Sequence, residues 1–205
     1  MVELKVEDIK KLRENKRRFC QTFDLVVNIS NLDLKKPENR IRDRIKVPHK
    51  IKDRKICFIV DSLIAKAKET NQKVLTKTEL DFSKREGKKI AKEYDFFVVE
   101  APLMPIVAKT LGKYVGPRNK PLIPVSPMAK NLSSIIEELE RTISVNLVKN
   151  PVIQVPIGTE KLEDKEIIEN FNVAFDKLKE SVEGKKGLIK SVYIKLTMSK
   201  PIKLI

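Results

Sequence analysis

The sequence predicts a two-domain protein of mixed class, in which a discontinuous α+β domain is interrupted by an inserted α/β domain. Near both ends of the 205-residue chain, apolar and polar residues alternate, which is typical of half-buried strands. Between these segments, continuous apolar runs alternate with helical stretches, as a parallel sheet covered by helices requires. The expected domains are 1–50 plus 142–205, and 51–141.

The outer segments are predicted to hold two helices and five strands. Apolar residues at helical spacing predict a helix over 3–16, and strict alternation predicts strands over 23–29 and 41–47, the second ending at Pro48. After the insertion, strands are expected over 143–147 and 152–157, joined by a turn at Asn150-Pro151. An amphipathic helix over 163–182 and a strand over 192–198 complete this domain.

The inserted segment is predicted to be a small, Rossmann-like parallel sheet with covering helices. Its alternating elements are expected in the order strand 56–60, helix 62–69, strand 73–76, helix 78–92, strand 96–99, helix 102–111 and helix 132–139. A hinge of two crossing chain segments would join it to the outer domain and permit relative motion.

The charge predicts a polyanionic partner. Lys and Arg number 43 against 28 Asp and Glu, which gives a net charge of +15, and the excess is spread through all three segments. A solvated surface and a membrane surface are the alternatives, but the Trp- and Phe-rich apolar face of a membrane-bound helix is missing. No apolar run is long enough for a membrane span and two cysteines form no disulfide framework, so we expect a soluble intracellular protein.

Catalytic and cofactor-binding patterns are missing from the sequence. The six glycines form neither a G-x-G-x-x-G turn nor a phosphate-binding P-loop. Cys20, Cys57 and His49 have no metal-ligand spacing, and Cys57 lies in an apolar run typical of a core. His49 is interpreted as a turn or backbone-contact residue. We therefore expect no enzyme, no metal and no cofactor.

Three basic segments are unusual for pure scaffolding, and each has two interpretations. In Lys16–Asp24, Phe19 is either a core anchor for the first helix or an exposed ring among cations that suits RNA. In Leu111–Pro121, Arg118 and Lys120 would project from a rigid loop, or the segment is a simple connection. In Lys195–Pro201, the end of the last strand either meets RNA or is a fraying terminus.

Taken together, these segments resemble the L-one family of ribosomal proteins, which builds the mobile stalk of the large subunit. The resemblance covers essentially the whole chain, is closer to the archaeal form, and is carried by Arg18–Asp24, Lys36–Arg40, Val47–His49, Tyr94–Phe97, Leu103–Pro105, Leu111–Arg118, Ile157–Glu160, Glu169-Asn170 and Thr197-Met198. It implies a cytoplasmic, ribosome-bound monomer that contacts ribosomal RNA of the stalk and exit-site transfer RNA. It also implies repression of translation through the protein's own messenger RNA.

The resemblance also assigns residues to the RNA site. Carried over by position, the main RNA contacts are Arg18, Phe19, Thr22, Thr197, Met198, Ser199 and Lys200. Secondary contacts are expected from Lys113, Arg118 and Lys120. The chain departs from the family where Ser199 and Asn119 replace common glycines, and the acidic contact residue of the first helix stays open among Glu7, Asp8 and Glu14.

Two other functions remain as alternatives to a structural ribosomal protein. A non-specific nucleic-acid-binding protein would bind unrelated duplexes as well as the stalk RNA. A small-ligand-binding α/β enzyme with an incidental basic surface would bind nucleotides, but it lacks the glycine and catalytic patterns.

Overall fold

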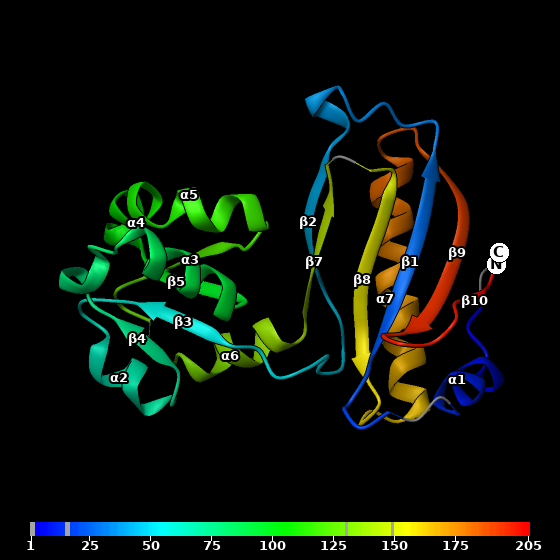
Figure 1. Ribbon diagram of the computed structural model, residues 1–205, viewed down its shortest axis with the longest axis horizontal. Coiled ribbons are helices and arrows are strands. Elements are labelled where there is room, and N and C mark those ends of the chain that lie inside the picture. Colours follow the sequence, from blue (N-terminus) through cyan, green and yellow to red (C-terminus); the bar gives the residue numbers. More distant parts are fainter. Residues whose placement is uncertain (1–2, 15–16, 130, 149) are drawn as a thin grey trace. The chain divides into compact units, whose positions relative to one another are not determined.

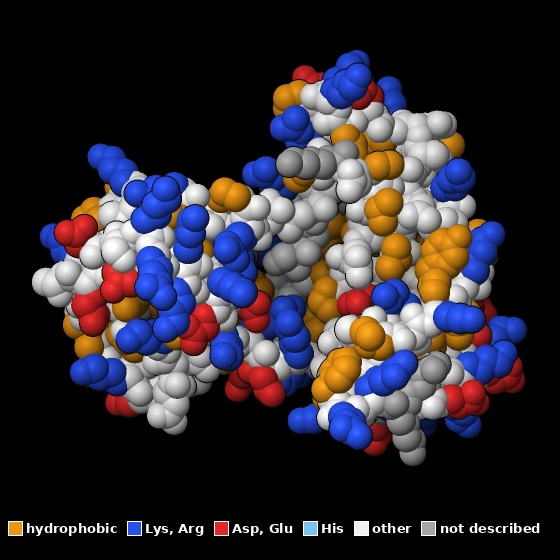
Figure 2. Space-filling view, in the orientation of Figure 1, with side chains coloured by type: hydrophobic (Ala, Val, Ile, Leu, Met, Phe, Trp, Pro, Cys, Tyr) orange, Lys and Arg blue, Asp and Glu red, His pale blue; other side chains and the backbone are white. Residues whose placement is uncertain are grey.

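The computed structural model describes residues 3–14, 17–129, 131–148 and 150–205 (Figure 1). The chain divides into two compact units. Unit 1 comprises the described residues of Met1–Lys52 and Arg141–Ile205, and unit 2 comprises those of Asp53–Glu140. The sheets of unit 1 are antiparallel and the sheet of unit 2 is parallel, which confirms the predicted mixture of α and β structure. Lys and Arg side chains are visible on both units (Figure 2).

A four-stranded antiparallel sheet forms the centre of unit 1. Its strand order is β10-β9-β1-β8, with the bounds Ile202–Lys203, Leu188–Leu196, Thr22–Ser30 and Val152–Thr159. Alternate residues of β1, from Phe23 to Ile29, are buried on one face of the sheet. This apolar face shares a core with the helices α1 (Val6–Arg13) and α7 (Asp164–Glu183), as the period-2 pattern requires.

A second, two-stranded sheet adds to the same core. Strand β2 (Ile41–Lys46) pairs antiparallel with β7 (Thr142–Leu147), and Ile45 lies opposite Ile143. Both isoleucines are buried in the core that α7 covers. The long insertion between these strands therefore leaves them paired.

Unit 2 holds a four-stranded parallel sheet of order β4-β3-β5-β6. Its elements follow one another as β3 (Ile56–Ile59), α2 (Ile64–Glu69), β4 (Lys73–Leu75), α3 (Lys84–Glu93), β5 (Phe96–Glu100), α4 (Met104–Thr110), α5 (Gly112–Val115), β6 (Leu122–Val125) and α6 (Ser133–Glu140). Successive residues of β5 enter two different apolar clusters, with Phe97 in one and Phe96 in the other. The sheet is therefore buried on both faces, as its continuous apolar runs predict.

Several element boundaries differ from the sequence prediction for identifiable reasons. The predicted helix over 78–92 is divided, because Ser83 caps a new helix by accepting from the Glu86 amide. The predicted loop over 111–121 contains α5, and β6 was missed because it contains Pro124. Strand β9 starts at Leu188, since an irregularity in its pairing interrupts the alternation. Helix α1 is shorter than predicted, and Lys16 lies outside the described residues.

Candidate nucleic-acid interface

Three chain segments meet where strand β1 begins. Thr22 lies opposite Thr159 at the end of β8, and Phe23 lies opposite Leu196 at the end of β9. Because β1 is antiparallel to both neighbours, its start must lie beside their ends. The structure thus brings the predicted segments 17–22 and 197–200 together at one end of the strands, with the chain after β8 beside them. We call this place the sheet-end site.

Two threonines fasten the last strand to the first at this site. The Thr22 amide donates to Thr197 Oγ1 over 3.1 Å, and the Thr197 hydroxyl lies 3.4 Å from the Thr22 carbonyl oxygen. The amide and the carbonyl of Thr22 therefore both contact Thr197 Oγ1. This contact continues the pairing of the two strands by one residue beyond Leu196. The position of the exposed turn that follows is fixed by this contact.

Gln21 and Glu160 form a polar centre that the sequence interpretation did not assign. Gln21 is fully buried; its amide donates to Glu160 Oε2 (2.8 Å) and its Nε2 donates to Glu160 Oε1 (3.1 Å). Its Oε1 accepts from the Met198 amide at 3.1 Å. Gln21 therefore joins all three segments. The sequence did contain a sign of its burial, because Gln21 lies two residues before the buried Phe23 and so falls on the same face of the alternating pattern.

Two large apolar side chains are exposed beside this polar centre. Phe19 is 51% exposed and Met198 is 58% exposed, whereas Phe23 is completely buried. Phe23 therefore occupies the core, which corrects the alternative that Phe19 anchors the first helix there. Exposed rings and flexible thioethers are well suited to pack on bases or riboses.

The cations of the segment divide into exposed and structural ones. Arg17, Arg18 and Lys200 are exposed at the site. Arg13 instead ties α1 to the chain after β8: its Nε lies 2.9 Å from Asp164 Oδ1, and its terminal nitrogens donate to the carbonyls of Glu160 and Leu162. Arg17, Arg18 and Lys200 therefore present their charge to solvent, whereas Arg13 is used within the protein.

Ser199 stabilises the turn after β9. Its hydroxyl oxygen accepts from the Leu196 amide at 2.9 Å, and the Ser199 amide donates to the Leu196 carbonyl at 3.1 Å. The serine that replaces a common family glycine is thus accommodated without a positive φ. In unit 2, Asn119 does adopt a left-handed conformation, with φ of 53°, which explains why glycine also suits that position.

The three residues of unit 2 that are expected to make secondary RNA contacts differ in their surroundings. Arg118 is exposed, and Lys113 is exposed with its ammonium 5.1 Å from the centre of the Tyr114 ring. Lys120 is half-buried and donates to the carbonyl oxygens of Tyr94 and Lys92. The expectation that Lys120 projects from its loop is therefore wrong, because this lysine fastens the loop to the end of α3.

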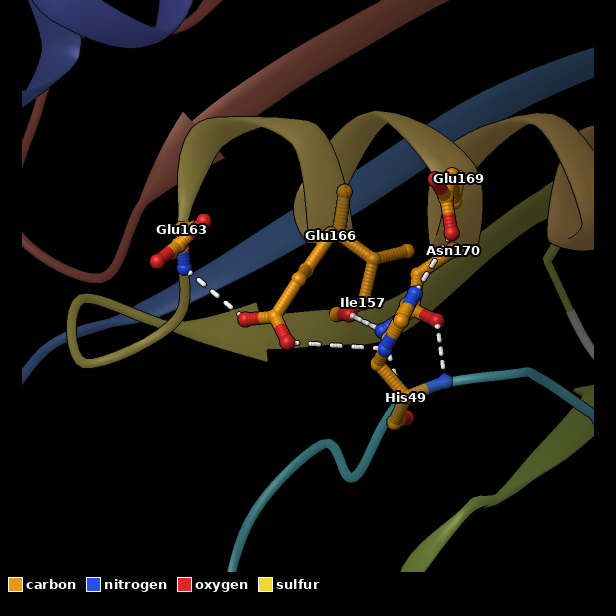
Figure 3. Close-up of polar contacts among 6 residues, drawn as sticks. All are labelled: His49, Ile157, Glu163, Glu166, Glu169 and Asn170. Atoms are coloured by element: carbon orange, nitrogen blue, oxygen red, sulfur yellow. Dashed lines mark hydrogen bonds and ion pairs between the residues drawn. The ribbon is translucent and has the colours of Figure 1, made fainter.

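His49 makes the backbone contact that its position after Pro48 suggested (Figure 3). The buried Asn170 of α7 accepts from the His49 amide at 2.9 Å and donates to its carbonyl at 3.3 Å; it also donates to the carbonyl of Ile157 at 2.8 Å. The ring lies between two carboxylates, with Nε2 2.6 Å from Glu169 Oε2 and Nδ1 3.5 Å from Glu166 Oε1. The residue thus belongs to a structural clamp.

The described residues contain no group of three or more His, Cys, Asp or Glu side chains that could hold a metal ion. Burial raises the pKa of the Cys57 thiol to about 12, which suits an inert core residue. None of the described helices has the length and apolar character needed to cross a bilayer.

Comparisons with known proteins agree with the resemblance. The model of the Ribosomal protein L1p/L10e family matches residues 9–200. The chain is 42% identical to the large ribosomal subunit protein uL1 of Pyrococcus abyssi, over 97% of this chain and 94% of that protein. It is 40% identical to the uL1 protein of Thermococcus kodakarensis, over 97% and 95%, and 35% identical to that of Methanothermobacter thermautotrophicus, over 98% of each.

The class is therefore that of the ribosomal proteins. More narrowly, the chain belongs to the Ribosomal protein L1p/L10e family. The family prediction, including the archaeal-like form, is confirmed, and membership in a ribosomal protein family confirms that the chain is not an enzyme.

Proposed function

We propose that this protein is a component of the large ribosomal subunit and that its sheet-end site binds ribosomal RNA of the mobile stalk. The observation that supports this most directly is the pair of exposed apolar side chains, Phe19 and Met198, beside the hydrogen bonds of the buried Gln21. Exposed Arg18 and Lys200 add the charge that attracts phosphates. Thr22 and Ser199 position the backbone.

We further infer that units 1 and 2 are separate domains with different tasks. The outer domain, 1–50 plus 142–205, carries the main RNA site, and the inserted Rossmann-like domain, 51–141, supports contact with departing transfer RNA through Arg118 and Lys113. The compact division of the chain close to these boundaries supports this assignment. The same site is proposed to repress translation by binding a similar fold in the protein's own messenger RNA.

The first test is a binding titration. The full chain is mixed with a stalk ribosomal RNA fragment over a range of salt concentrations, with an unrelated structured RNA as competitor. Tight binding that resists the competitor supports shape-specific recognition. Equal binding of both RNAs, with a shared steep salt dependence, would contradict it in favour of non-specific binding.

Substitutions at the site test which residues carry recognition. We expect Phe19→Ala to lower affinity for the fragment by about 1–3 kcal/mol, the scale of an aromatic–base contact. Thr197→Ala should also weaken binding, since the hydroxyl fixes the turn. Leu188→Ala is the matched control, because Leu188 is 57% exposed at the opposite end of β9. If Phe19→Ala and Thr197→Ala both bind like the control, the site is misplaced.

The regulatory and transfer RNA roles need separate measurements. Added protein should lower cell-free translation of its own message, and Thr197→Ala should relieve this repression, while an unrelated message is unaffected. Ribosomes lacking the chain should release deacylated transfer RNA more slowly. Unchanged translation or release would remove the corresponding role and leave the structural one.

A further inference from the structure

Helix α3 of unit 2 carries a one-sided row of cations. Lys84, Lys88 and Lys92 follow one another at intervals of four residues, so their side chains lie on the same side of the helix, about 6 Å apart along its axis. All three are exposed. The acidic residues Glu86 and Glu93 lie on the other side and line a different hollow. Lys89 lines that hollow too, so only the side with Lys84, Lys88 and Lys92 carries cations without a carboxylate.

This row is unfavourable for the isolated helix. Like charges four residues apart destabilise a helix by about 0.2–0.5 kcal/mol for each pair. Among the described residues, no carboxylate lies within ion-pair distance of Lys84, Lys88 or Lys92. The helix is instead held by its capping box at Ser83 and by its buried small residues, Gly87 and Ala91. Lys92 is favoured by its place in the last turn of the helix, but helix stability gives no reason for Lys84 and Lys88, whereas an anionic partner does.

A second helix, α5, packs against α3 and carries a further cation. A Cβ atom on Gly87 would lie 2.4 Å from Cε2 of Tyr114, so only a glycine lets the ring of α5 pack this closely on α3. The Lys113 ammonium is held against that ring, 5.1 Å from its centre. Figure 2 shows blue side chains gathered over the part of unit 2 that α3 and α5 form in Figure 1.

We propose that Lys84, Lys88, Lys92 and Lys113 form a second RNA-binding surface, the α3–α5 basic face, which contacts the phosphate backbone. This inference rests on the proposed function only for the class of partner. Its charge is complementary to a polyanion, and the row lacks the large apolar side chains that a membrane or a protein hot spot would use. The face has no Asn or Gln to read bases, so its binding should be independent of sequence.

The test uses the full chain and two RNAs. Wild-type protein is first saturated with the stalk ribosomal RNA fragment, and a 20-base-pair RNA hairpin of arbitrary sequence is then titrated at about 50–200 mM salt. We expect the hairpin to bind the complex with strong salt dependence. Failure of the hairpin to bind at the lowest salt would overturn the proposal, and an acidic protein would become the better candidate partner.

Charge substitutions locate the binding. The triple variant Lys84→Gln, Lys88→Gln, Lys92→Gln should lower the salt slope of hairpin binding by about 2–3, since each phosphate contact contributes about 0.7–0.9. The matched control, Lys177→Gln, Lys179→Gln, Lys185→Gln, removes the same charge from exposed positions in unit 1 and should change the slope far less. Equal slopes in the two triple variants would refute the α3–α5 basic face.

The two proposals fail in different ways. The triple variant on unit 2 should bind the stalk fragment as the wild type does, because the sheet-end site is intact. If the wild type itself does not bind that fragment, the proposed function is wrong, and hairpin binding is then measured on the free chain. A thermal unfolding curve like that of the wild type shows that the lost binding does not reflect misfolding.

Discussion

Replacing Gln21 with Ala should loosen the sheet-end site from within. The side chain donates to Glu160 Oε1 and accepts from the Met198 amide, each over 3.1 Å. A hydrogen bond to a charged group contributes about 1.5–3 kcal/mol and a neutral one about 0.5–1.5 kcal/mol. Water can replace part of the first contact, because Glu160 is partly exposed. We therefore expect a loss near the lower sum, about 2 kcal/mol.

A second variant serves as the control for the side-chain volume that Gln21→Ala removes. Gln21→Met removes the same hydrogen bonds and keeps most of the volume, so equal losses in the two variants would assign the effect to hydrogen bonding rather than to a cavity. Since two compact units need not unfold together, the informative measurement is local. Exchange of the Met198 amide proton should be clearly faster in both variants, because both remove the side-chain oxygen that accepts from it.

RNA binding by the two Gln21 variants tests whether the position of Met198 matters, and not only its presence. Both variants retain Phe19 and Met198, yet they release the turn that holds Met198, so affinity for the stalk fragment should fall. Unchanged Met198 exchange together with wild-type RNA affinity would refute the reasoning that Gln21 positions this site. Faster exchange with unchanged affinity would show that Met198 lies outside the RNA contact.

Two further predictions concern buried polar groups. Asn170→Ala should cost unit 1 about 2–4 kcal/mol in urea unfolding, because it leaves the His49 amide and the Ile157 carbonyl unpaired, whereas exposed Asn172→Ala should cost little. Burial raises the pKa of Glu100, which is only 2% exposed, but hydrogen bonds from the Asp61 and Ser62 amides and the Ser62 hydroxyl outweigh this and lower it overall. The stability this carboxylate contributes is therefore complete above its unfolded pKa and is lost as pH falls through the lower folded value. Glu100→Gln should remove that part of the acid dependence of unit 2, and an unchanged acid dependence would contradict the assignment.

The sequence predicted buried strands more reliably than exposed boundaries. The runs around Phe58 and Phe97 are apolar without interruption, and burial on both faces gives a strand that signal. Strand β6 lacks it, because Pro124 removes a donor and most of the strand is only partly buried. The division between Leu80 and Lys84 follows from capping, which depends on two residues rather than on a periodic pattern.

The site was predictable in part. The basic segment and its exposed aromatic are visible in the sequence, but the exposure of Phe19 needed the family resemblance or the structure. The pairing of Thr22 with Thr197 joins residues 175 positions apart, so no local pattern contains it. Gln21 and Asn170 did carry a local signal, since each is a polar residue in the phase of a buried face, and such residues are normally hydrogen-bonded.

The topology also fixes when the sheet-end site can exist. Strand β1 pairs only with β8 and β9 among the described strands, and both follow the insertion in the sequence. Unit 2 is continuous in the sequence and its strands pair over shorter separations, so its contacts form at a lower cost in loop closure. The sheet-end site is complete only when Thr197 reaches Thr22 and Met198 reaches Gln21. If the sheet-end site binds RNA as proposed, only a chain whose outer sheet has already formed can bind it there, and the hydrogen-bonded strands behind the site limit the ordering cost of binding.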